Sequence, residues 1–129
     1  MTTGLLELPL KGLHAELGGK FVPFAGYSMP VQYAAGVMAE HLWTREKAGL
    51  FDVSHMGQVR LSLDQASALE QIAPIEVEGL AEGRQRYGFL TNEAGGLVDD
   101  FMIARYEDCF VIVINAARRA EDLALFEKH

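Results

Sequence analysis

Two adjacent carboxylates, Asp99 and Asp100, have the residue type and the setting best suited to chemistry in this chain. They follow a turn that contains Asn92 and the pair Gly95 and Gly96, and they begin an apolar run. Successive residues of a strand point to opposite faces, so the two acids cannot act as a carboxylate dyad. Only one of them can face a given pocket.

A strand period of two places Asp100 on one side together with Val98, Met102 and Ala104. An acid among apolar side chains is partly desolvated, which is costly unless another group pairs with it, and this makes the acid a candidate for function. Aspartate after a pair of glycines is also ordinary turn chemistry. The residue types alone leave both interpretations of Asp100 open.

A hairpin must position the two acids, because a glycine-containing loop separates the strand-like runs 86–90 and 97–104. Before the hairpin, the patterns predict a strand at residues 58–63, a helix at 64–73 that Pro74 ends, and an irregular connection at 75–83. After it, they predict a turn at residues 106–108, a strand at 110–115 and a terminal helix from about 116. This order resembles a ferredoxin-like α+β sandwich with an extra strand. We therefore predict an α+β fold in which an antiparallel sheet has helices on one face.

In a ferredoxin-like fold one more strand normally follows the last helix. We therefore expect this chain to be an N-terminal portion of a longer protein, with residues 57–129 as a ferredoxin-like subdomain truncated before its last strand. Residues 1–56 would form the N-terminal part of the first subdomain. Its patterns predict a helix at residues 10–17, an edge strand around Pro23 at 20–25 and an aromatic loop at 26–33. A helix at residues 37–48 and a short strand at 50–56 should follow.

The composition excludes several classes of function. The net charge is -7 and the basic residues are few and scattered, so we expect no nucleic-acid partner. Cys109 is the only cysteine, which excludes an intrachain disulfide and any CxxC motif and fits a reducing compartment. We see no targeting segment and no membrane-spanning apolar run, so we predict a cytoplasmic protein with no membrane partner.

The remaining candidates for chemistry have structural interpretations. Ser54 and His55 are adjacent and point apart in an extended chain, so we expect Asp52 and Ser54 to bond nearby backbone groups instead. The four histidines show neither HxH nor HExxH spacing, and we expect no metal.

Four segments of this chain closely resemble the aminomethyltransferase (T-protein) family of the glycine cleavage system. They are GGKFVPFAGYSMPVQY, LFDVSHMGQ, LTNEAGGLVDD and VIVINA, at residues 18–33, 50–58, 90–100 and 111–116. FDVSHM alone is also similar to the folate-binding halves of dimethylglycine and sarcosine dehydrogenases. The segment NEAGGLVDD, and the absence of a GxGxxG flavin fingerprint ahead of Met56, favour the T-protein family.

The resemblance implies a T-protein-like folate-binding fold and a tetrahydrofolate-dependent transferase. Its members convert the aminomethyl group on the dihydrolipoyl arm of H-protein to 5,10-methylenetetrahydrofolate and ammonia. The alternatives are the folate-binding part of a demethylating dehydrogenase and a non-catalytic folate-binding homologue. We interpret the chain as part of a bacterial, cytoplasmic T-protein. Because family members are longer, the resemblance implies that this chain alone is inactive and that further folate contacts lie beyond His129. It also implies that strand 110–115 is left as an exposed edge.

The resemblance also assigns residues. Asp100 matches the functional second acid of the family's DD pair, and a fixed, partly desolvated carboxylate there can stabilise the cation left by thiolate departure and influence its proton. Met56, Tyr87, Val113 and Asn115 are implied to line the pterin pocket, with Asn115 suited to the polar edge of the ring and Met56 and Val113 to its faces.

Overall fold

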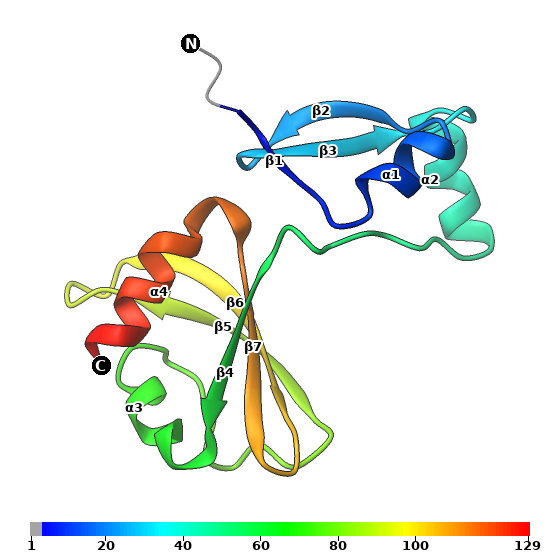
Figure 1. Ribbon diagram of the computed structural model, residues 1–129. Helices are drawn as coiled ribbons and strands as arrows, with labels where there is room; N and C mark the ends of the chain where they lie inside the picture. Colours follow the sequence, from blue (N-terminus) through cyan, green and yellow to red (C-terminus); the bar gives the residue numbers. More distant parts are fainter. Residues whose placement is uncertain (1–3) are drawn as a thin grey trace. The chain divides into compact units, whose positions relative to one another are not determined.

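The structure is a computed structural model that describes residues 4–129. It divides into two compact units, one up to His55 and one from Met56 onward (Figure 1). In residues 4–129, no helix has both the length and the apolar character that a membrane span requires.

The first unit contains a three-stranded sheet and two helices. Its elements are β1 (Leu6–Glu7), α1 (Lys11–Glu16), β2 (Lys20–Phe24), β3 (Tyr27–Gln32) and α2 (Val37–Glu46). β3 lies in the centre, parallel to β1 and antiparallel to β2. Both predicted helices and the edge position of β2 are confirmed.

The prediction of a loop at residues 26–33 is wrong, since β3 occupies most of this segment. Ala25 and Gly26 connect β2 to β3 with φ values of 49° and 82°, which are the positive values that a type I′ hairpin turn needs at both positions. Pro30 is tolerated because β1 pairs only with Tyr27 and Ser28, so Pro30 has a partner strand on one side alone. The short strand predicted at residues 50–56 is also wrong, because that segment has no strand.

The second unit contains a four-stranded sheet in the order β4-β7-β6-β5, in which every neighbouring pair is antiparallel. Its elements are β4 (Gly57–Ser62), η1 (Leu63–Gln65), α3 (Ala66–Glu70), β5 (Gln85–Thr91), β6 (Leu97–Arg105), β7 (Cys109–Ile114), η2 (Ala116–Arg118) and α4 (Arg119–Lys128). The predicted hairpin is the β5–β6 pair.

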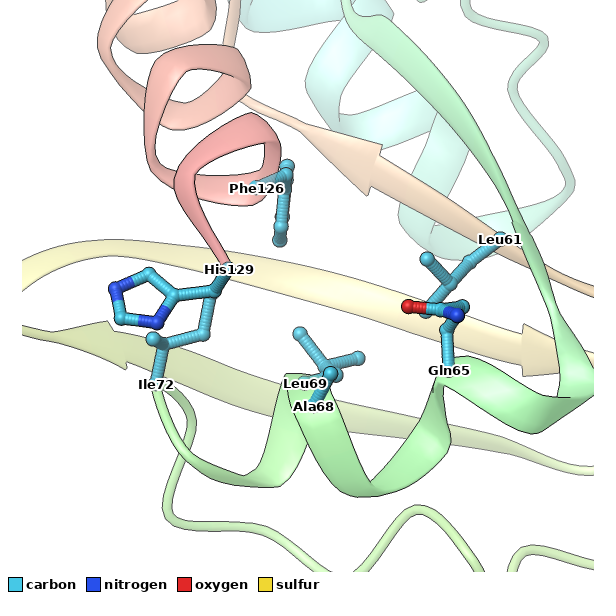
Figure 2. A pocket seen from close by; sticks show the side chains of 7 residues that line it. All are labelled: Leu61, Gln65, Ala68, Leu69, Ile72, Phe126 and His129. Carbon is cyan, nitrogen blue, oxygen red and sulfur yellow. The ribbon is translucent and has the colours of Figure 1, made fainter.

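One face of this sheet carries the core. Leu90, Phe101, Ile103, Ile112 and Ile114 alternate along β5, β6 and β7, and all are buried. Both helices pack on this face, α3 through Ala66 and Leu69 and α4 through Leu123, Leu125 and Phe126. Figure 2 shows Phe126 of α4 close to Leu69 and Ala68 of α3 around a small apolar pocket. The predicted α+β fold, an antiparallel sheet with helices on one face, is therefore confirmed.

Three sequence predictions about this unit are wrong. Strand β7 is not an exposed edge, because it lies between β4 and β6. The helix predicted at residues 64–73 exists, but its bounds are wrong: α3 covers only Ala66–Glu70, and beyond it the Ile72 carbonyl accepts a hydrogen bond from the backbone N–H of Thr91 on β5 (2.9 Å). Val98 does not share the side of Asp100: the register of β5 and β6 shifts between Leu90 and Thr91, and Val98 packs against the core.

Candidate functional site

Asp100 lies on the face of the sheet opposite the core. It belongs to β6, where its partner across the ladder is Phe89 of β5. On the other side, Ile114 at the end of β7 pairs with Phe101, so the next residue, Asn115, comes opposite Asp100. The carboxylate is thus held between a half-buried aromatic ring and an amide.

Two side chains hold the Asp100 carboxylate. The Tyr87 hydroxyl donates to Oδ2, and the Asn115 Nδ2 donates to Oδ1 and, at 3.3 Å, to the Asp100 carbonyl oxygen. The Tyr87 hydrogen bond is the main cause that lowers the pKa of Asp100, and it outweighs partial burial, which raises that pKa. The same hydrogen bond raises the pKa of Tyr87. At neutral pH Asp100 is therefore a carboxylate and Tyr87 a neutral donor.

Apolar side chains surround this carboxylate on the same face. Met102 is the ladder partner of both Tyr87 and Val113. The Tyr87 and Phe89 rings meet edge to face, with their centroids 5.1 Å apart. Carboxylate, hydroxyl and amide thus converge beside a surface of aliphatic and aromatic atoms, the mixture typical of small-molecule sites.

The five site residues predicted from the sequence all lie in the second unit. Asp100, Tyr87 and Asn115 are joined by hydrogen bonds. Val113 lies beside them on the same face, and Met56 directly precedes Gly57, whose ladder partner is Ile114. The structure therefore brings three of the residues into contact and places the other two next to the end of β7.

Asp99 points to the core side, where its ladder partner is Leu90. Its Oδ1 accepts from the Asn115 Nδ2 (3.1 Å), so one amide contacts both adjacent acids. It also meets Asp122 of α4, a side chain that is 0% exposed. Sequence reasoning missed Asp122, although its helical spacing to Leu125 and Phe126 places this acid on the apolar stripe of α4.

A family model, the GCVT N-terminal domain, matches residues 10–129 of this chain. The chain belongs to this family. Two aminomethyltransferases are each 46% identical to it: a mitochondrial one from Dictyostelium discoideum, over 93% of this chain, and one from Rubrobacter xylanophilus, over 97%. The chain spans only 30% and 34% of these relatives.

The fold of this GCVT N-terminal domain is also that of a solved relative. The crystal structure of glycine cleavage system aminomethyltransferase T from Bartonella henselae matches with a TM-score of 0.91 and 41% identity. The match covers 97% of this chain and 35% of that protein. The resemblance inferred from the sequence motifs is therefore confirmed at the level of family and fold.

A second cluster of polar side chains lies in the first unit of the GCVT chain. His14 of α1 makes hydrogen bonds from Nε2 to Asp52 Oδ2 (2.8 Å) and between Nδ1 and the Tyr33 hydroxyl (2.6 Å). Asp52 Oδ1 also accepts from the Ser54 backbone N–H at 2.9 Å, as the sequence predicted. These bonds, with the His14 bond first among the causes, lower the pKa of Asp52 to about 2.

This second cluster has a structural role in the first unit. Its imidazole and carboxylate side chains are only 9% and 8% exposed, and they join α1 to the segment after α2. Burial is the largest cause that raises the pKa of Tyr33, followed by Glu40 and Asp52. His55 is separate from it and packs edge to face against the rings of Phe24 and Tyr27.

Within residues 4–129, no three potential ligands among His, Cys, Asp and Glu gather in one place. The pocket in Figure 2 is lined mainly by apolar side chains, with Gln65 and His129 at its border. Asp100 and its partners are thus the cluster to which the family resemblance and the geometry both point.

Proposed function

We propose that the protein carrying this chain is a tetrahydrofolate-dependent aminomethyltransferase of the glycine cleavage system. One observation carries the proposal: the Asp100 carboxylate is fixed by Tyr87 and Asn115 on a largely apolar face. The names of the relatives support the reaction class. The substrates would be H-protein that bears an aminomethyl group on its dihydrolipoyl arm, and tetrahydrofolate, with a cytoplasmic location.

The residues around Asp100 fit a reduced pterin. The Asn115 Nδ2 group is committed to the oxygens of Asp99 and Asp100, because a carboxylate can only accept hydrogen bonds. This fixes the orientation of the amide and leaves its oxygen to accept an N–H from the polar edge of the ring. Met56 and Val113 would contact the faces of the pterin, and Tyr87 would border it.

When bound, tetrahydrofolate supplies the ring nitrogens that accept the one-carbon unit. As the C–S bond to the lipoyl arm breaks, the sulfur would leave as a thiolate with the electron pair, positive charge would develop on the one-carbon unit, and the amino group would depart as ammonia. A carboxylate already fixed beside it stabilises this charge without reorganisation, and it can hold the proton that a folate nitrogen releases. Apolar neighbours such as Met102 would keep water from the one-carbon unit.

Replacement of the carboxylate by an amide tests this role. Asp100→Asn keeps the size of the side chain and removes its charge, so we expect kcat for methylenetetrahydrofolate formation from aminomethylated H-protein to fall by roughly 100-fold or more. Thermal unfolding should change little. The matched control is Asp108→Asn, whose carboxylate is 68% exposed at the other end of β6 and β7 and should leave kcat unchanged. Parent-like activity of Asp100→Asn would refute the proposed role.

A further inference from the structure

The carboxyl group of Asp122 on α4 interacts with that of Asp99 on β6, whose Oδ2 atom is buried. Asp122 is 0% exposed. Among residues 4–129, neither Asp122 oxygen nor Oδ2 of Asp99 has a hydrogen-bond donor. Two ionised carboxylates in this position would repel each other with no compensating donor, a costly arrangement.

A single shared proton resolves the repulsion. Burial first, and then the hydrogen bond and charge of Asp99, raise the pKa of Asp122 to about 7. The other charged groups that face it are Arg118, which lowers this pKa, and Glu121, which raises it. Below about pH 7, Asp122 is therefore neutral, and a neutral carboxyl group, unlike a carboxylate, has an O–H to donate to an oxygen of Asp99.

The hydrogen bonds continue from this pair to the candidate site. Asp99 accepts from the Asn115 Nδ2 at 3.1 Å, and the same nitrogen donates to the Asp100 carboxylate. Asn115 follows the last residue of β7, where no ladder partner fixes it by regular pairing. Its amide therefore depends on the two carboxylates for its orientation.

We propose that Asp122 is a positioning residue, which holds Asp99 by a shared proton and, through Asp99 and Asn115, sets the orientation of the Asp100 carboxylate. The inference rests on the proposed function only for its catalytic consequence. The hydrogen-bonded chain itself, Asp122 to Asp99 to Asn115 to Asp100, joins α4 to the opposite face of the sheet. The geometry of the site around Asp100 therefore depends on whether Asp122, a core residue, is protonated.

The test compares two replacements of Asp122 in the protein carrying this chain. Asp122→Asn retains an uncharged donor to Asp99, and we expect parent-like kcat. Asp122→Leu removes the donor, and we expect kcat to fall by roughly 10-fold or more with a smaller change in KM, because a misplaced carboxylate still admits the substrate. Glu127→Gln, an exposed change on the same helix, is the matched control.

A second readout is independent of activity. The side-chain carboxyl carbons of Asp100 and Asp122 are followed by NMR as a function of pH in the same variants. We expect the Asp122 carbon of the parent to titrate near pH 7, and Asp122→Leu to move the Asp100 titration to higher pH while Glu127→Gln leaves it unchanged. Asp122 titrating near pH 4, or an unmoved Asp100 titration in folded Asp122→Leu, would overturn the proposal.

The two readouts separate this inference from the proposed function. If Asp100→Asn proved fully active, the reaction assignment would fail, whereas the NMR titrations would still decide whether Asp122 positions Asp100. If Asp122→Leu does not fold, the positioning role of Asp122 is tested by the titration of Asp122 in the parent and by the activity of Asp122→Asn. Lower kcat in a folded Asp122→Asn would contradict the role of the retained donor.

Discussion

At the scale of single residues, the acids of the second unit differ because each side of the sheet offers different partners. Asp100 meets a hydroxyl and an amide and stays ionised. Asp99, one position earlier, meets the buried carboxyl of Asp122. Opposite directions of adjacent side chains on a strand thus separate a candidate catalytic carboxylate from a structural one.

The Tyr87 hydroxyl gives a prediction at this scale. Tyr87→Phe removes the donor that contributes most to the low pKa of Asp100, so this pKa should rise toward its ordinary value. We expect the acid limb of the pH profile of kcat to move to higher pH, and kcat at neutral pH to fall less than in Asp100→Asn. Tyr106→Phe, an exposed tyrosine in the β6–β7 turn, is the control. An acid limb identical to that of the parent would contradict the assignment.

At the scale of elements, turns and strand ends decide which residues meet. The β2–β3 hairpin depends on two residues with positive φ, and only one of them is glycine. An L-residue in the left-handed region costs roughly 1–2 kcal/mol, so Ala25 keeps its conformation through the pairing of the flanking strands. The turn is therefore a place where local preference and strand pairing oppose each other.

Substitutions in this turn should have opposite effects. Ala25→Gly relieves the strain at φ 49° and should raise the free energy of unfolding by about 0.5–1 kcal/mol, whereas Gly26→Ala introduces strain at φ 82° and should lower it by about 1 kcal/mol. No atom lies within 4 Å of a Cβ at Gly26, so the effect is confined to the backbone. Thermal and urea unfolding measure both. Gly12→Ala in α1, where a Cβ also meets nothing, should instead stabilise the protein.

At the scale of the whole molecule, the two units are stabilised in different ways. The buried core cluster lies entirely in the second unit, between Ala66 and Ile114. In the described part of the first unit, the buried residues are Leu8 and His14. The first unit therefore depends more on polar contacts, above all on the bonds of His14 to Asp52 and Tyr33.

Asp52 of the first unit and Asp122 of the second should change the free energy of unfolding with pH in opposite directions. The pKa of Asp52 is lowered to about 2, so its contribution to stability is full above its ordinary pKa near 4 and is lost as the pH falls toward 2. The pKa of Asp122 is raised to about 7, so its contribution is full below about pH 4 and is lost as the pH rises toward 7.

Asp52→Asn isolates the first of these effects. We expect it to lower the free energy of unfolding at pH 7 by roughly 1–3 kcal/mol, because it leaves buried His14 with a poorer partner. It should also flatten the decline of stability between about pH 4 and pH 2. Urea unfolding across this range measures both changes, with exposed Asp64→Asn as the control. An unchanged acid decline would show that another group causes it.

The sequence by itself determined the features that depend on local patterns. These are the β5–β6 hairpin, the two helices of the first unit, strand β7 and the family, since each follows from neighbouring residues or a contiguous motif. It also predicted Asp100 and its neighbours as site residues, an assignment that stays a prediction. The cytoplasmic location stays one as well.

Only the tertiary structure decided which distant segments pair. The placement of β7 inside the sheet depends on its pairing with β4, and the His14–Asp52 contact joins residues 38 positions apart. In the sequence, Asp122 is an ordinary acid of a helix. It is buried beside Asp99 only because α4 packs on the sheet. Such contacts depend on how helices and strands pack rather than on local pattern, because burial and partner are properties of the assembled fold.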